Sequence, residues 1–226
     1  MAKPKAFLSW SSGKDSAFAL HETLKAGEVE IVGLLTTLNM HHGRVAMHGV
    51  REALLDAQAA ALGLPMVKVE LPWPCPNGTY ERLMADAVEA ITAQGVTHMI
   101  FGDLFLEDIR AYRETQLAGT GLTPVFPLWQ RPTETLCREM IESGIDARLV
   151  CVDEAQLSPS FAGRLYDEAL LADLPAGIDP CGERGEFHTC VVGSPDFSAP
   201  LSVYPGEVVS RDGFTFADLV PDTVSA

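Results

Sequence analysis

The sequence predicts an α/β protein with a doubly wound, mostly parallel five-stranded sheet, followed by a smaller C-terminal α+β domain. Two observations predict this architecture. Over the first 130 residues, short apolar segments alternate with segments whose apolar residues recur at helical spacing, which is typical of a parallel sheet covered by helices on both faces. Beyond residue 129 this alternation stops, and a proline- and glycine-rich stretch precedes the last strands. We therefore expect domains at residues 1–130 and 131–226.

The first domain is expected to contain five buried strands, at residues 6–10, 30–38, 65–71, 96–101 and 124–128. Helices are expected between them, at residues 16–26, 50–62, 79–94 and 110–118. Gly27 and Gly63 follow the first two helices as stop signals. Sheets of this kind bind their ligands at the carboxyl ends of the strands, so we expect the functional site there.

The second domain is expected to contain a helix at residues 132–143 and strands at residues 147–152, 187–192, 207–211 and 214–219. The last two strands are separated by Asp212-Gly213, which is a signal for a hairpin turn. The apolar C-terminal strands are compatible with a homodimer interface, although no residue pattern specifies one.

Composition excludes several classes of partner. The chain has 226 residues and a formal net charge of −15, with 16 basic and 31 acidic residues, which argues against extended contact with nucleic acid. The five cysteines include no C-x-x-C pair, so reduced thiols are expected. No apolar run is long enough for a signal peptide or a membrane span. We expect a cytoplasmic protein that contacts no membrane.

A short polar motif lies between the first strand and the first helix. In the run AFLSWSSGKDSAFALHETL, it consists of Ser11, Ser12, Gly13, Lys14, Asp15 and Ser16. Successive backbone N–H groups at the positive end of a helix dipole bind anions. Glycine lets the backbone approach closely, lysine adds a positive charge, and serine hydroxyls donate hydrogen bonds to phosphate oxygens. The motif therefore predicts a phosphate-binding loop.

Asp15 does not suit direct contact with phosphate, because its carboxylate repels the anion. It is a candidate Mg²⁺ ligand or a helix cap. A Walker A loop is excluded, because G-x-x-x-x-G-K-[ST] requires glycine where Leu8 stands and serine or threonine where Asp15 stands. These six residues alone leave one alternative open, which is a capped surface helix that binds no ligand.

The motif resembles the S-G-G-K-D-S pyrophosphate loop of the ATP pyrophosphatases, in the adenine nucleotide α-hydrolase-like (HUP) superfamily, with Ser12 replacing the first glycine. Ser12 is expected to preserve the turn provided that its φ angle is negative. Three further segments resemble the diphthine–ammonia ligase family: GDLFLEDIRAYRE from residue 102, GLTPVFPLW from residue 121 and CGERGEFHT from residue 181. Together with the loop they span almost the whole chain, and the last is the most specific.

The resemblance implies a two-step reaction that uses ATP and Mg²⁺. A carboxylate oxygen of the acceptor attacks the α-phosphorus, pyrophosphate leaves into the loop, and ammonia then displaces AMP to form an amide. The segment at residues 181–189 is called the acidic segment. The catalytic residues expected from the loop and the acidic segment are Lys14, Asp15, Glu183, Glu186 and His188. Strand alternation is expected to put Glu186 and His188 on one face, where they position ammonia or carry its proton. The alternative is a solvated strand face.

Further nucleotide contacts are expected after the fourth strand. Gly102 and Asp103 end that strand at the same sheet edge, so Asp103, like Asp15, is a candidate Mg²⁺ ligand, and a turn residue is the alternative. Arg110 is a candidate nucleotide-binding residue by the resemblance. Its alternative is a surface ion pair with Glu114, four residues further along the predicted helix.

Two other groups of residues complete the predicted site. By the resemblance, main-chain groups of residues 33–37 contact adenine. His41, His42 and His48 have no cysteine or acid at ligand spacing, so we interpret them as loop histidines rather than zinc ligands, with His48 near the nucleotide.

The function predicted from the sequence is an AMP-forming ATP pyrophosphatase that activates a carboxyl group for amidation by ammonia or ammonium. The carboxyl-bearing acceptor, a protein side chain or a small molecule, is not identified. One alternative is an ATP-dependent tRNA-modifying enzyme, which needs an RNA-binding surface, and a chain with 16 basic and 31 acidic residues offers poor material for one beyond a local basic groove. The other is a non-catalytic adenine-nucleotide-binding sensor, which would not require the distal acids Glu183 and Glu186.

Overall fold

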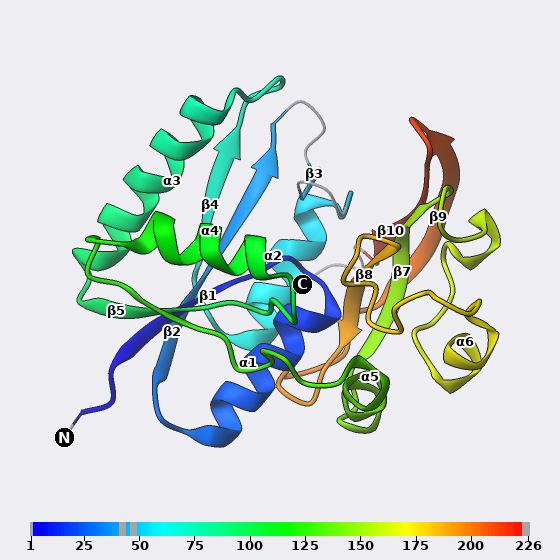
Figure 1. The fold of residues 1–226 in the computed structure, drawn as a ribbon, viewed down its shortest axis with the longest axis horizontal. Coiled ribbons are helices and arrows are strands. Elements are labelled where there is room, and N and C mark those ends of the chain that lie inside the picture. The colour runs from blue at the N-terminus through cyan, green and yellow to red at the C-terminus, as the bar shows by residue number, and fades with distance from the viewer. Residues whose placement is uncertain (1, 41–43, 46–48, 223–226) are drawn as a thin grey trace.

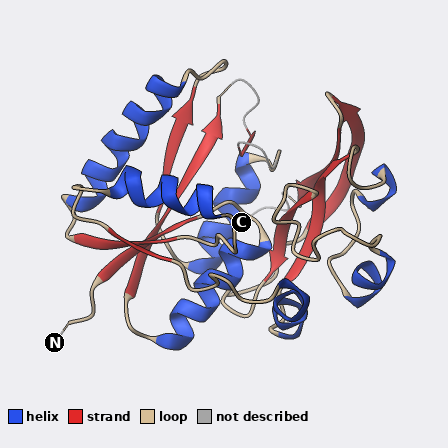
Figure 2. Ribbon diagram, in the orientation of Figure 1, coloured by secondary structure: helices blue, strands red, loops and turns tan. Residues whose placement is uncertain are grey.

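The computed structural model describes residues 2–40, 44–45 and 49–222, so His41, His42 and His48 lie outside the described residues. It contains two β-sheets side by side (Figure 1), each accompanied by its own helices (Figure 2). Sheet A consists of β1 (Lys5–Ser9), β2 (Glu30–Asn39), β3 (Arg44–Val45), β4 (Met66–Leu71), β5 (Val96–Ile100) and β6 (Thr123–Val125). Sheet B consists of β7 (Asp146–Asp153), β8 (Phe187–Gly193), β9 (Val203–Arg211) and β10 (Phe214–Pro221).

Sheet A confirms the predicted doubly wound parallel architecture. β2 pairs with β1 and β4, β1 pairs with β5, and β5 pairs with β6, all in parallel. The described part of the sheet has six strands rather than five, because the two-residue β3 pairs antiparallel with Leu38 and Asn39 at the end of β2. A strand of two residues is too short to produce a pattern in the sequence.

Helices cover both faces of sheet A. They are α1 (Lys14–Ala26), α2 (Glu52–Leu62), α3 (Asn77–Thr92) and α4 (Glu107–Leu117). Successive residues of β1 point to opposite faces, so Leu8 packs in one apolar cluster with α1 and α2, and Phe7 packs in another with α3 and α4. The chain runs from β1 through β2 to β4 on one side and then crosses to β5 and β6. The strand order therefore reverses between β1 and β5, where such folds bind ligands.

Sheet B is antiparallel in the order β8-β7-β10-β9. It is accompanied by α5 (Thr133–Glu142), a 3₁₀ turn at Pro159–Phe161, and α6 (Glu168–Asp173), which is too short for a periodicity to predict. The β9–β10 hairpin turns at Asp212 (φ 54°) and Gly213 (φ 82°), as the Asp-Gly pair predicts. No helix in the described part of the chain is long and apolar enough to cross a membrane.

The two sheets are connected by a buried side chain, Gln58 of α2. Its Oε1 accepts a hydrogen bond from Trp10 Nε1 at 2.8 Å, and its Nε2 donates to the carbonyls of Ser12 at 3.2 Å and Val191 at 2.7 Å. The N–H of Val191 donates to the Ser12 carbonyl at 2.9 Å. Strand β8 of sheet B is thereby held against the segment that follows β1 of sheet A.

Replacing Gln58 with leucine is expected to lower the free energy of unfolding by about 2–4 kcal/mol, because the buried groups of Trp10 and Val191 lose their partner. Denaturant unfolding measures this change. The matched control is Gln94→Leu, since Gln94 is exposed just beyond α3 and its side chain donates to the nearby Ala90 carbonyl, and it is expected to change the free energy by less than about 0.5 kcal/mol. Equal effects of the two substitutions would contradict the assigned role of Gln58.

Candidate active site

The predicted phosphate loop surrounds the N-terminus of α1. The helix begins at Lys14, two residues before the predicted start, with Gly13 as its N-cap and no capping side chain. Ser11 Oγ lies 3.2 Å from Ser16 Oγ, and the Ser16 hydroxyl donates to the Gly13 carbonyl at 2.9 Å. Small hydroxyl side chains and the N–H groups of a first helical turn thus lie together, which is an arrangement that binds phosphate.

Ser12 has a φ angle of 70°, so the negative φ on which the expected turn is conditional is not observed, and the loop forms with a positive φ instead. The cause is its carbonyl, which accepts hydrogen bonds from Val191 and Gln58 and is thereby held toward β8. Its side chain is fully buried, and Oγ makes no hydrogen bond. Ser12 therefore shapes the loop through its backbone, in a left-handed conformation that favours glycine.

A cleft of about 780 Å³ lies between this loop, the end of β5 and the start of β8. It brings together predicted residues from three distant segments of the chain: Ser11, Lys14, Asp15, Ser16, Gly102, Asp103, Glu183 and His188. Four other predicted residues do not line it: Ser12, Gly13, Arg110 and Glu186. The acidic segment near the C-terminus is thus adjacent to the phosphate loop.

Lys14 is buried at the back of this cleft. Its Nζ donates to both carboxylate oxygens of Asp15 at 2.9 Å and to the carbonyl of Cys181. The rings of Tyr166 and Phe187 lie 5.4 and 5.6 Å from the ammonium. Burial opposes the charge, but the Asp15 carboxylate holds the pKa of Lys14 above its ordinary value. The lysine is therefore a permanent positive charge beside the loop.

Three carboxyl groups line the same cleft, and burial raises the pKa of each. The pKa of Glu183 reaches about 7, with a further contribution from the charge of Asp15, while its Oε1 accepts a hydrogen bond from Leu104 N at 2.8 Å. Burial also raises the pKa values of Asp15 and Asp103 above the ordinary range. Because negative charge is unfavourable here, a bound cation would stabilise the ionised carboxylates.

Asp15 and Asp103 have the chemistry of magnesium ligands. Asp103 Oδ2 is buried and makes no hydrogen bond, and Nε of Arg113 lies 3.7 Å away, beyond hydrogen-bonding distance. Within the described ranges, no three His, Cys, Asp or Glu side chains form a ready metal cage. Mg²⁺ usually binds one or two carboxylates and completes its coordination with water and substrate phosphate, so this donor set fits the ion.

Gly102 permits a close approach that no other residue would. A Cβ atom at this position would lie 2.9 Å from the backbone carbon and oxygen of Asp15. The end of β5 therefore packs directly against the first turn of α1, and Asp103 is carried to the edge of the phosphate loop.

Glu186 and His188 are placed differently from one another. β8 begins at Phe187, so Glu186 precedes the strand, and its carboxylate accepts hydrogen bonds from the N–H groups of Asp179 at 3.0 Å and Arg184 at 2.9 Å. His188 lines the cleft, where burial lowers its pKa to about 4. His188 is therefore a neutral imidazole at physiological pH.

Arg110 lies outside the cleft. It donates to Glu114 at 2.8 Å, and its guanidinium lies 4.7 Å from the ring centres of Phe126 and Trp129. The arginine that lines the cleft is Arg113, on the same helix. Arg113 is not predicted as a site residue from the sequence, because spacing alone does not show which side of α4 faces the sheet.

A second cavity of about 970 Å³ adjoins the cleft, beneath α3 and α4. The two share Ser9, Phe101 and Arg113 in their linings. The second cavity is predominantly apolar, and its lining includes Tyr80 and Leu35, the latter within the segment expected at adenine. An anionic subsite beside an apolar one suits a nucleotide, with its phosphates and its base.

The doubly wound parallel sheet carries a phosphate-binding loop at its switch point, which is typical of nucleotide-binding α/β proteins. Comparison with protein families finds the diphthamide synthase N-terminal domain at residues 4–123 and the diphthamide synthase C-terminal domain at residues 132–216. The chain belongs to the diphthamide synthase family.

Curated relatives agree with this assignment. The diphthine–ammonia ligase of Homo sapiens is 28% identical, over 92% of this chain and 85% of the human protein. That of Schizosaccharomyces pombe is 32% identical over 89% of this chain, but only 36% of the yeast protein is covered. The family resemblance predicted from the sequence is confirmed, and with it the expectation of an ATP-dependent ligase. A U34-tRNA thiolase from Methanococcus maripaludis has a TM-score of 0.39 at 15% identity, over 63% of this chain and 58% of that one, which is too low to support an argument.

Replacing Ser12 with glycine is expected to raise the free energy of unfolding by about 1 kcal/mol, because glycine adopts a φ of 70° without strain and removes the buried hydroxyl. Thermal and denaturant unfolding measure the change. Ser143→Gly is the control: Ser143 has a φ of −65°, so glycine there adds freedom to the unfolded chain and also removes the hydrogen bond from Ser143 Oγ to the Met140 carbonyl at 2.7 Å, and it is expected to destabilise. A Ser12→Gly protein less stable than the wild type would contradict the assignment of strain to Ser12.

Proposed function

We propose that this chain adenylates a carboxyl group with ATP and then amidates it with ammonia, releasing pyrophosphate and AMP. The observation that carries the proposal is the cleft in which the phosphate loop, the buried Lys14 and the acidic segment meet. The name diphthine–ammonia ligase, which the curated relatives share, supports the same reaction type. The acceptor proposed is a carboxyl-bearing protein side chain or small molecule.

The two cavities suggest how ATP binds. The β- and γ-phosphates lie against the first turn of α1, where the Ser11 hydroxyl donates a hydrogen bond and the Ser16 hydroxyl stays bonded to the Gly13 carbonyl. The adenosine extends into the adjoining apolar cavity, toward Leu35 and the ring of Tyr80. Arg113 borders both cavities and therefore lies near the α-phosphate.

In the first step, an oxygen of the acceptor carboxylate bonds to the α-phosphorus as the bond from that phosphorus to the bridging α,β-oxygen breaks. The leaving pyrophosphate gains negative charge, which the α1 N-terminus and Lys14 stabilise. Mg²⁺ held by Asp15 and Asp103 would neutralise further phosphate charge. Because these groups are already in place before the reaction, they need no reorganisation at the transition state.

In the second step, the ammonia nitrogen bonds to the acyl carbon and the bond to AMP breaks. The attacking nitrogen must lose a proton, and Glu183 is the proposed acceptor because its pKa of about 7 lies near physiological pH. His188 is neutral and lines the same cleft, and its proposed role is to orient ammonia. Glu186 is proposed to act indirectly, by shaping the segment that carries Glu183.

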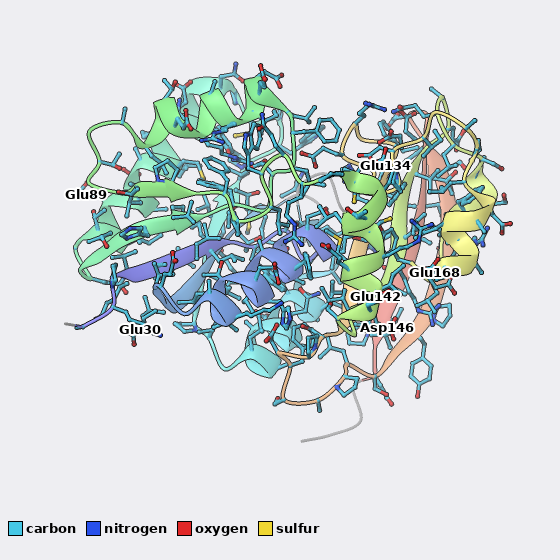
Figure 3. The ribbon with its side chains drawn as sticks, turned by 60° about the horizontal axis from the view of Figure 1, so that its bottom comes forward. Glu30, Glu89, Glu134, Glu142, Asp146 and Glu168 are labelled. Atoms are coloured by element: carbon cyan, nitrogen blue, oxygen red, sulfur yellow. The ribbon has the colours of Figure 1, made fainter. Side chains whose placement is uncertain are left out.

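The alternative of tRNA modification has no support from the surface or the thiols. Exposed carboxylates surround α5, α6 and the start of β7, as the labelled Glu134, Glu142, Asp146 and Glu168 show in Figure 3. Such a surface repels the nucleic-acid backbone. Burial raises the pKa of the Cys190 thiol to about 12, so it is not a nucleophilic thiolate at neutral pH.

We also propose that the protein forms a homodimer through its C-terminal strands. β9 lies at the end of the described strand order of sheet B and exposes Tyr204, Val208 and Val209. Exposed apolar residues on an outer strand are suited to pairing with a second copy.

Incubation with α-labelled Mg-ATP, ammonium and undialysed lysate from the source organism is expected to yield AMP and pyrophosphate. Lys14→Met is expected to lower this rate by about 100-fold or more, because the leaving group loses a positive charge. Lys25→Met is the control, since Lys25 is exposed at the other end of α1, and it is expected to retain the wild-type rate. Release of ADP and phosphate, or no turnover despite tight ATP binding, would sink the proposal, the latter in favour of a sensor.

The amidation rate is expected to rise with pH through about 7, because Glu183 must be ionised to accept a proton. Glu183→Gln should lower the rate at pH 8 and abolish this rise. Stability should change in the opposite sense: the folded-state pKa exceeds the ordinary 4.5, so ionising Glu183 between pH 4.5 and 7 costs stability. Glu183→Gln is therefore expected to be about 1–3 kcal/mol more stable than the wild type at pH 8. A pH profile unchanged by the substitution would refute this role.

A further inference from the structure

Two buried carboxylates fold the segment that carries Glu183. Asp179 accepts hydrogen bonds from Cys181 N at 3.3 Å and Glu183 N at 3.0 Å, one on each carboxylate oxygen. Glu186 in turn accepts from Asp179 N and Arg184 N. Asp179 and Glu186 are 4% and 1% exposed, so both are enclosed within the loop that they shape. Residues 179–186 therefore form a compact turn held from both ends.

This turn presents two groups to the reacting centre. The carbonyl of Cys181 accepts a hydrogen bond from Lys14 Nζ, and the carboxylate of Glu183 accepts one from Leu104 N. Both presenting residues have their own N–H groups bonded to Asp179. The Asp179 carboxylate thus orients two parts of the backbone: Cys181, whose carbonyl contacts Lys14, and Glu183.

A carboxylate at this position is electrostatically unfavourable for an anion-binding site. Burial raises the pKa of Asp15, and the nearby charge of Asp179 raises it further. An asparagine would avoid this charge, but it has a single acceptor oxygen and would point an NH₂ group at the second N–H. Only a carboxylate accepts from two N–H groups with both of its oxygens. The two hydrogen bonds to Asp179 therefore offset the unfavourable charge, and they fix the conformation of the turn.

From these contacts we infer that Asp179 is a positioning residue for the ligase reaction, which holds Glu183 and the Cys181 carbonyl in their working positions. The inference rests on the proposed function for the identity of the reaction. It adds a residue that lies outside the cleft lining and outside the motif of glycines and glutamates.

The test compares Asp179→Asn with Asp167→Asn. Asp167 is also an aspartate whose carboxylate accepts a backbone N–H, that of Leu170 at 2.8 Å, but it caps α6 away from the cleft. Amide hydrogen exchange is measured in both proteins, together with binding of α,β-methylene-ATP by calorimetry and AMP formation from α-labelled Mg-ATP with ammonium and undialysed lysate.

For Asp179→Asn, exchange at the amides of Cys181, Glu183 and Leu104 is expected to be at least 10-fold faster. The rate of AMP formation at saturating ATP is expected to fall at least 10-fold, with the dissociation constant of the analogue within threefold of wild type. Asp167→Asn should leave all three readouts at wild-type values. If Asp179→Asn does not fold, Glu186→Gln, which alters the other carboxylate of the turn, is expected to give the same pattern.

Unchanged protection of the Leu104 amide, or an unchanged AMP rate despite faster exchange, would overturn the inference. If the wild type forms no AMP at all, the proposed function fails by itself, and exchange at Leu104 still decides whether Asp179 positions Glu183. A parallel loss of rate and binding in both variants would indicate general destabilisation and would also overturn it.

Discussion

The hydrogen bonds between the Ser12 carbonyl and its partners Val191 and Gln58 are the constraint on which the rest of this structure depends. They attach β8, the strand in which the acidic segment ends, to the phosphate loop of sheet A. They also hold Ser12 in a left-handed conformation, which turns the chain into α1. The N–H of Lys14 adds another hydrogen bond between the phosphate loop and β8, because it donates to Thr189 Oγ1 at 3.1 Å. Residues far apart in the sequence thereby come to share one cleft.

The second feature of the site is the balance of charge among its buried groups. Lys14 forms an ion pair with Asp15, and Arg113 forms one with Asp103 at 3.7 Å, while burial disfavours the charges of Asp103 and Glu183. A nucleotide that arrives with a divalent cation brings both the negative and the positive charge that this arrangement can accommodate. The proposed nucleotide complex would therefore offset the stability that the buried carboxylates cost.

Much of the fold could be predicted because its signals are local. Each of the five parallel strands has a run of apolar residues, and the helices between them have apolar residues at helical spacing. The β9–β10 hairpin follows from Asp212-Gly213, whose residues tolerate positive φ. The two-residue β3 and the six-residue α6 escaped prediction because elements so short carry no periodicity. The connection of the two sheets through Gln58 could not be predicted either, because a single glutamine produces no recognisable sequence pattern.

For the site, the sequence by itself determined the chemical inventory: the hydroxyls, the lysine and the acids, because these are properties of residue types and of short motifs. Only the tertiary structure decided which of them meet. It turned Arg113 rather than Arg110 toward the cleft, because the rotation of α4 is set by packing. It also enclosed Glu186 within its own loop and made Asp179 its partner, because backbone N–H groups in a buried turn must find acceptors.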